Sequence, residues 1–119
     1  MKELKQSIND IFTCNPLCEF EKVFWCGDPV VCVELLIRDS EIVLNNIRVL
    51  DGKEKQGYAT KCLSVLKWIA NEHKAIITGS IEPSGKKLMK YDELKKWYIK
   101  NGFTEKNGNI TFYPKSLYK

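Results

Sequence analysis

Apolar and polar positions follow two different periods along this chain, and the changes of period predict its order of elements. Apolar residues spaced by three and four positions are typical of helices, whereas runs of β-branched and aromatic residues are typical of strands. Helices are predicted at residues 2–12, 57–73 and 88–101, and strands at 20–26, 30–38, 41–50, 74–82, 103–106 and 110–113. Because a helix separates strand 41–50 from strand 74–82, we expect these two strands to run parallel through a right-handed crossover. The pattern therefore predicts an α+β domain in which three helices flank a mixed sheet.

Turn residues separate these elements. Gly27-Asp28-Pro29 predicts a hairpin turn, and Gly102 predicts the left-handed residue that ends the last helix. The inward face of that helix is expected to carry Tyr91, Leu94, Trp97 and Tyr98.

Length and composition favour one globular domain. The chain has 119 residues, of which 44% are hydrophobic and 29% charged, so a single domain over residues 1–119 is expected. No apolar run approaches the roughly 18 residues of a membrane span. The first residues lack the apolar core of a signal peptide, so we expect a cytoplasmic location. The net charge of +4 suits an anionic cofactor and does not by itself indicate nucleic acid.

The cysteines predict neither a metal site nor a disulfide framework. Their number is odd and their spacings match no paired zinc pattern, so we expect no metal and buried, reduced thiols. They are Cys14, Cys18, Cys26, Cys32 and Cys62.

The loop between strand 41–50 and the next helix is suited to an anion. Backbone N–H groups at a helix N-terminus lack partners within the helix, and the helix dipole is positive there. The helix is expected to start on Gly57, and the small Ala59 lets an anion approach the backbone closely. Neither Gly-x-x-x-x-Gly-Lys nor Gly-x-Gly-x-x-Gly occurs, which excludes two common phosphate loops. The turn is therefore expected to bind a cofactor.

Three segments make residues 30–113 similar to the GCN5-related N-acetyltransferase (GNAT) superfamily. They are a strand ending Ile47-Arg48-Val49, the turn Gln56-Gly57-Tyr58-Ala59-Thr60, and Trp97-Tyr98-Ile99-Lys100-Asn101-Gly102-Phe103, which is similar to the family's Leu-Tyr-x-Lys-x-Gly-Phe. The resemblance implies a mostly antiparallel sheet with a central, splayed pair of parallel strands. It also implies transfer of an acetyl group from acetyl-CoA to an amine.

The same resemblance implies where the cofactor lies. Main-chain N–H groups of residues 55–60 would bind the CoA pyrophosphate, and the pantetheine arm would lie between the strand ending at Val49 and the strand from Ala75 to Ser80. The implied cofactor-binding residues are Ile47, Val49, Lys55, Gln56, Gly57, Tyr58, Ala59 and Thr60.

Some positions depart from the family pattern. Glu54 stands where relatives usually have Arg or Gln, and its carboxylate would repel a pyrophosphate, although Lys53 and Lys55 flank it and offset that charge. Tyr91 stands where many relatives place an Asn that contacts CoA, so no role is carried over to it. The segment before residue 20 is short, and the family's usual first strand is expected to be missing.

Acetyl transfer needs three groups. The amine must lose its proton before it attacks, the oxyanion needs a donor, and the departing thiolate benefits from an acid. By resemblance the acid is Tyr98, whose other interpretation is a core tyrosine, and the oxyanion donor is the main-chain N–H of Val49 or a neighbour. The predicted base is Glu41, with Glu34 as an alternative, and a base acting through water would need neither. His73 is expected to be structural.

These features predict an acetyl-CoA-dependent N-acetyltransferase in which a primary amine attacks directly in a ternary complex. Nothing selects between a small-molecule and a protein amine, although the small size favours an open cleft and an exposed amine. Ser80, Glu82 and Ser84 are expected to border the acceptor pocket, and strand 110–113 can pair with a second copy to form a homodimer. One alternative is a non-catalytic acyl-CoA-binding sensor. Lysine pairs leave open a nucleic-acid-associated domain, but neither nucleic acid nor a membrane is the expected partner.

Overall fold

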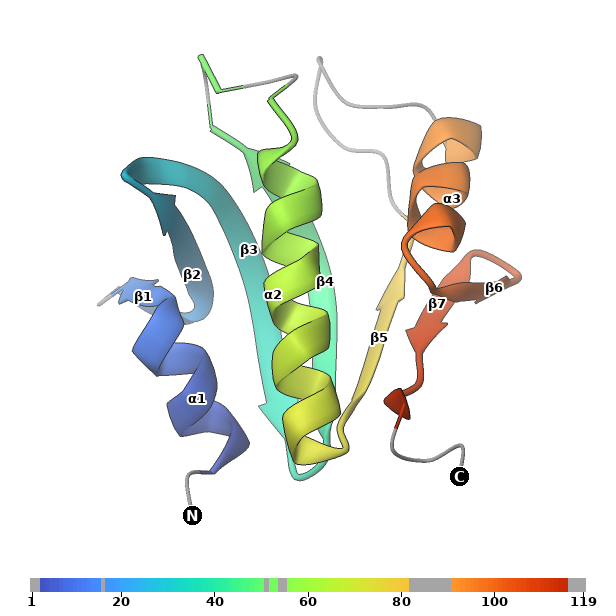
Figure 1. The fold of residues 1–119 in the computed structure, drawn as a ribbon, viewed down its shortest axis with the longest axis horizontal. Coiled ribbons are helices and arrows are strands. Elements are labelled where there is room, and N and C mark those ends of the chain that lie inside the picture. The colour runs from blue at the N-terminus through green and yellow to red at the C-terminus, as the bar shows by residue number, and fades with distance from the viewer. Residues whose placement is uncertain (1–2, 16, 51, 54–55, 82–90, 116–119) are drawn as a thin grey trace.

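The computed structural model describes residues 3–15, 17–50, 52–53, 56–81 and 91–115, which form a single sheet with helices packed on it (Figure 1). The helices are α1 (Leu4–Ile11), α2 (Tyr58–His73) and α3 (Tyr91–Lys100). The strands are β1 (Thr13–Asn15), β2 (Cys18–Cys26), β3 (Asp28–Arg38), β4 (Glu41–Val49), β5 (Ile76–Ser80), β6 (Thr104–Lys106) and β7 (Asn109–Phe112). No helix among these residues is long and apolar enough to cross a membrane.

The seven strands form one mixed sheet in the order β1-β2-β3-β4-β5-β7-β6. Neighbouring strands are antiparallel except for β4 and β5, which helix α2 connects and which run parallel. The predicted α+β class, the three helices and the central parallel pair are therefore confirmed.

Helices α1 and α2 cover the same face of the sheet (Figure 1). Helix α2 buries Leu63, Leu66 and Ile69 against apolar side chains that alternate along the strands, including Val33 and Ile42. Alternation places the remaining strand side chains on the opposite face. The apolar core thus lies on one side of the sheet, and the other side is left for polar residues.

A β-bulge in β4 interrupts the centre of the sheet. Leu44 pairs with Leu35 and Asn46 pairs with Glu34, so Asn45 is the extra residue of β4. The parallel pairing of β4 with β5 ends at the same point, with Leu44 opposite Gly79. Because bulges bend a strand and increase its twist, β4 diverges from β5 beyond Leu44. The inserted residue Asn45 therefore explains why the parallel strands β4 and β5 separate, as predicted.

Several predicted details are wrong. Residues 13–15 form a short strand that the sequence pattern did not predict, and Pro29 lies inside β3 rather than in a turn. Tyr91 is not inward: it is 39% exposed, because it begins α3 and its hydroxyl donates to Glu105 Oε2 at 3.4 Å. Of the cysteines, only two are buried, Cys32 and Cys62, whereas Cys14, Cys18 and Cys26 are exposed.

Gly79 provides a test of the strand geometry. A Cβ added to this residue would lie 2.6 Å from the main-chain oxygen of Leu44, a rigid neighbour on β4. We expect Gly79→Ala to lower the free energy of unfolding by about 1–3 kcal/mol, the usual cost of overpacking. Urea unfolding measures this change. The exposed neighbour Ser80 is the control: Ser80→Ala should stay within about 0.5 kcal/mol, and equal effects would show that the close approach of the strands is not the cause.

Candidate functional site

The N-terminus of α2 has the geometry of an anion site. Gly57 caps the helix in the left-handed conformation, with φ +77°, and its oxygen accepts the hydrogen bond of Lys61 N at 3.0 Å. This is the first bond of the helix, so the N–H groups of the first turn, Tyr58, Ala59 and Thr60, precede it. These groups were predicted to bind pyrophosphate, and the helix starts one residue later than predicted. Lys55 and Glu54 lie outside the described residues.

Helix α3 is held beside this turn. Trp97 Nε1 donates to Thr60 Oγ1 at 3.0 Å, and Lys67 Nζ donates to Asn101 O at 2.7 Å. These two bonds join α2 to the C-terminal end of α3. The segment similar to the family's Leu-Tyr-x-Lys-x-Gly-Phe is thereby placed next to the predicted cofactor turn.

The divergence of β4 from β5 exposes main-chain donors. Leu50 N donates to Val30 O at 2.9 Å, so the amide of Leu50 points toward β3. Amide directions alternate along a strand, and the N–H groups of Val49 and Ile47 therefore point away from β3, into the opening beside β5. Both side chains pack against the core. Main-chain donors and the α2 N-terminus thus border the same opening.

Tyr98 lies on the buried side of α3. It is 5% exposed, and its ring packs edge-on against Phe103, with 5.4 Å between ring centroids. Burial raises the pKa of its hydroxyl from 10.0 to about 12. Tyr98 is therefore protonated at neutral pH and can donate a hydrogen bond. Its packing is that of a core tyrosine, and its role as the acid stays a prediction.

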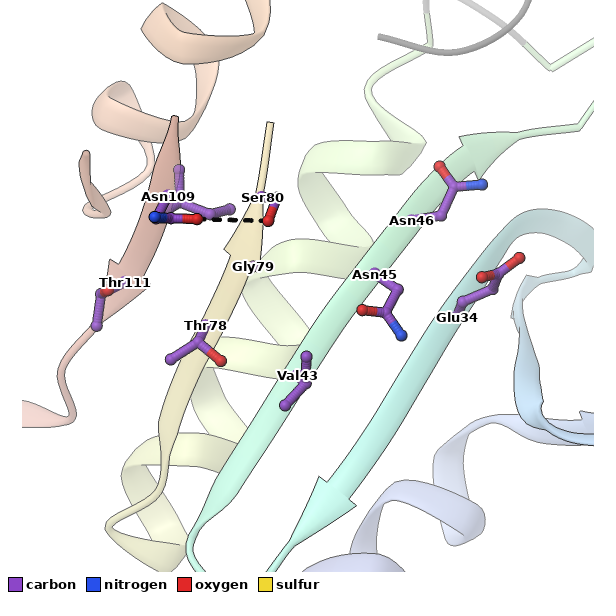
Figure 2. Close-up of a pocket in the computed structure, with 10 residues that line it drawn as sticks. Glu34, Val43, Asn45, Asn46, Thr78, Gly79, Ser80, Asn109 and Thr111 are labelled. Carbon is purple, nitrogen blue, oxygen red and sulfur yellow. Dashed lines mark hydrogen bonds between the residues drawn. The ribbon is translucent and has the colours of Figure 1, made fainter. Parts of the chain in front are cut away.

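A polar pocket of about 610 Å³ lies on the sheet face opposite α2. Figure 2 shows α2 behind the sheet and the polar side chains of four strands on the near face. The polar lining residues are Glu34, Asn45, Asn46, Thr78, Ser80, Asn109 and Thr111. Glu34 is the only charged residue among the described lining residues, and its carboxylate attracts a cation.

The two predicted base candidates occupy different ends of this face. Glu34 pairs with Asn46 at the bulge and lines the pocket. Glu41 is three residues before Leu44, about 10 Å along the strand, and its Oε2 accepts a hydrogen bond of 2.7 Å from Thr78 Oγ1. Glu34 thus lies across β4 from the opening, and Glu41 is linked to the pocket through Thr78.

The structure also places three other residues discussed from the sequence: Ser80, His73 and Cys62. Ser80 lines the pocket as predicted, with its hydroxyl 3.4 Å from Asn109 Oδ1, whereas Glu82 and Ser84 lie outside the described residues. His73 Nε2 lies 2.8 Å from Ser7 Oγ and ties α2 to α1, as expected of a structural residue. Burial raises the pKa of Cys62 to about 12, which makes it a poor nucleophile.

The sequence did not predict the pocket residues Asn46, Thr78, Asn109 and Thr111. Single polar residues on strands carry no motif, and Asn46 shares a face with Thr78 only because of the bulge. One signal was available: apolar positions change from even numbers, Ile42 and Leu44, to odd numbers, Ile47 and Val49. Such a change of phase within a strand indicates one inserted residue.

Comparison with known proteins identifies the fold. No protein-family profile matches the sequence, and neither does any curated protein sequence. The structure is similar to the ribosomal-protein-S18-alanine N-acetyltransferase from Escherichia coli, with a TM-score of 0.62 and 14% identity, covering 92% of this chain and 86% of that chain. It is also similar to a GNAT family acetyltransferase from Elizabethkingia anophelis with acetyl-CoA bound, with a TM-score of 0.55 and 15% identity, covering 79% and 76% of the two chains.

A third similar structure is the anti-CRISPR protein AcrVA5, with a TM-score of 0.60 and 16% identity, covering 70% of this chain and 90% of that chain. At these identities the similarity establishes the fold, and the activity has to be argued from the site. The fold implied by the resemblance is thereby confirmed.

The raised pKa of Tyr98 predicts a change of stability at alkaline pH. The folded-state pKa of Tyr98, about 12, is above the ordinary value of 10.0. The contribution of the neutral hydroxyl to the free energy of unfolding is therefore complete below pH 10 and is lost as pH rises toward 12. Because one pKa unit corresponds to 1.36 kcal/mol, the free energy of unfolding should fall by roughly 3 kcal/mol at most.

Urea unfolding of the wild type and Tyr98→Phe between pH 9 and 12 isolates this effect from the titration of lysines. The free energy of unfolding should fall more steeply in the wild type. Parallel pH profiles for the two proteins would show that the hydroxyl titrates normally.

Proposed function

We propose that this chain, which has the fold of the GNAT superfamily, transfers the acetyl group of acetyl-CoA to a primary amine by direct attack in a ternary complex. The observation that carries the proposal is the opening between β4 and β5. It begins at Leu44 and Gly79, contains the amides of Ile47 and Val49, and is bordered by the N-terminus of α2. An extended acyl thioester attached to a diphosphate matches this combination of a slot and an anion site.

The cofactor would be held mainly by the main chain. The N–H groups of Tyr58, Ala59 and Thr60 would bind the pyrophosphate, the left-handed Gly57 positions the turn, and Gln56 directly precedes it. The pantetheine arm would hydrogen-bond to the free edge of β4, as an added strand does. This arrangement supports acetyl-CoA as cosubstrate without a dedicated cationic side chain.

The chemistry would take place at the narrow end of the opening. The amine nitrogen attacks the thioester carbonyl, the amide of Val49 or Ile47 stabilises the oxyanion, and the tetrahedral intermediate expels the CoA thiolate. With a pKa of about 12, Tyr98 holds its proton more tightly than an ordinary thiol of pKa about 8.5. Its role would therefore be to donate a hydrogen bond to the leaving sulfur rather than to transfer its proton completely.

The polar pocket on the other face would receive the acceptor amine. Figure 2 shows Asn45 and Asn46 on β4 beyond the point where it leaves β5, and Glu34 across β4 on the same face, so an amine bound there would approach the thioester from the face opposite α2. Glu34 would attract the protonated amine and then accept its proton, directly or through water. Glu41, the base predicted from the sequence, is the alternative to Glu34.

A protein amine would fit this pocket best. The pocket is open to solvent, and its described lining residues provide several amides and hydroxyls and one carboxylate, which suits a single cationic amine on a peptide rather than a polyamine. The similarity to an enzyme named for the alanine of ribosomal protein S18 supports the same class. We therefore propose an N-terminal or lysine amine of a polypeptide as acceptor.

The burial of Tyr98 favours one competing function. Tyr98 is 5% exposed and does not line the pocket, so a protein that binds acyl-CoA without turnover would have the same features. Such a sensor would retain the α2 turn and the opening between the strands.

Thiol release distinguishes the enzyme from the sensor. We expect acetyl-CoA to raise the melting temperature of the protein, because a ligand that binds only the folded state stabilises it. Addition of a panel of peptide amines should release free CoA thiol. Stabilisation without thiol release for any peptide, amino acid or polyamine would favour the sensor, and the absence of stabilisation by CoA or acetyl-CoA would contradict both functions.

Matched glutamine variants test the base. We expect Glu34→Gln to lower kcat/KM at neutral pH by about 10²-fold, a typical contribution of a general base. The loss should shrink at high pH, where the amine loses its proton unaided. Glu41→Gln is the control and should change kcat/KM less. The reverse order would assign the base to Glu41, and small effects in both would indicate that neither carboxylate accepts the proton.

A further inference from the structure

A buried lysine lies against a cysteine at the edge of the sheet farthest from the proposed acyl site. Lys22 is 2% exposed, and it is the one buried charged residue among those that the structure describes. Its Nζ donates to Cys14 Sγ at 3.3 Å. Neither ion pair found within the described part of the chain involves Lys22. Because burying an amine without a hydrogen-bond partner is costly, the sulfur is the group that compensates Lys22.

The sheet keeps these two side chains together. Cys14 and Lys22 are direct partners in the antiparallel pair of β1 and β2, so their side chains leave the same face of the sheet. The neighbouring Phe12 and Phe24 rings pack with 5.6 Å between their centroids and hold β1 in place. Lys22 therefore has little freedom to move away from Cys14.

Cys14 is reduced and exposed, whereas its lysine partner is enclosed. A small oxidant in solution can reach the sulfur, and the oxidised sulfur then lies beside a nitrogen nucleophile. Sulfenic acids condense with nearby nitrogen as well as with thiols. The pair thus has the components of a covalent bond between sulfur and nitrogen.

We propose that Cys14 and Lys22 form a sulfenamide cross-link when the protein is exposed to a peroxide. The Cys14 sulfur first attacks hydrogen peroxide: the O–O bond breaks, the sulfur is oxidised to a sulfenic acid, and the peroxide is reduced to water. Lys22 then gives its ammonium proton to water, the resulting amine attacks the sulfur, the S–N bond forms, and the hydroxyl leaves as water with a further proton from the nitrogen. In sum, a thiol, an amine and one hydrogen peroxide give one sulfenamide and two waters.

The cross-link would fasten β1 to β2 without reaching the opening between β4 and β5. Two thiols would reverse it: they return the Cys14 thiol and the Lys22 amine and become a disulfide themselves. The site is thus a reversible modification that protects the exposed Cys14 from irreversible oxidation. It does not depend on the proposed acetyltransferase activity.

Peptide mapping of the wild-type chain tests the proposal directly. The intact protein is treated with hydrogen peroxide, its remaining thiols are blocked, and it is cleaved after glutamate. Cleavage after Glu19 and Glu21 separates Cys14 from Lys22 in the sequence, so only a covalent bond keeps their peptides together. We expect a cross-linked peptide pair in which Cys18, Cys26 and Cys32 all carry the blocking group, which distinguishes the sulfenamide from a disulfide to Cys26 or Cys32, and its loss after dithiothreitol.

Two variants control the assignment. Lys22→Arg keeps the positive charge and cannot form this cross-link, so dimedone should trap several-fold more sulfenic acid at Cys14 than in the wild type. Cys18→Ser removes the nearest cysteine in sequence and should leave the cross-link unchanged. Oxidation of wild-type Cys14 to a sulfinic acid without a cross-linked peptide would overturn the proposal, as would a disulfide between Cys14 and Cys18 as the main product.

Discussion

The end of the pairing between β4 and β5 is the constraint on which the rest of the structure depends. Two parallel strands joined by a helix ordinarily continue side by side, because each main-chain group gains a hydrogen bond from its neighbour. Here one extra residue, Asn45, turns β4 away after Leu44, and the amides of Ile47 and Val49 lose their natural partner strand. Donors at the centre of a sheet are costly to leave unpaired, so this opening favours a ligand that can hydrogen-bond to an extended main chain.

The same divergence organises both faces of the sheet. On the face covered by α2, the helix N-terminus lies at the wide end of the opening and α3 is joined to it through Trp97 and Thr60. On the other face, the change of phase at the bulge places Asn46 beside Glu34 and Thr78 in a polar pocket. A cofactor on one side and an amine on the other can therefore meet at the strands. The proposed transfer between two bound molecules depends on this arrangement of the two faces.

Much of this arrangement could be predicted from the sequence, because long amphipathic segments and glycine turns carry strong local signals. The helix after Gly57 and the parallel pair follow from the change of apolar period. The three-residue strand β1 is too short to show a period, and the outward position of Tyr91 depends on its bond to Glu105 from another element. The pocket could not be assembled in advance, since its residues come from four strands whose register is fixed by tertiary pairing.

Amide chemical shifts measured during titration with CoA test the central claim most directly, because they report the opening and the helix N-terminus separately. The account predicts the largest changes at the amides of Ile47, Val49, Tyr58, Ala59 and Thr60, with little change in β1 and β2. Saturable binding that leaves these five amides unchanged and shifts resonances elsewhere would contradict it.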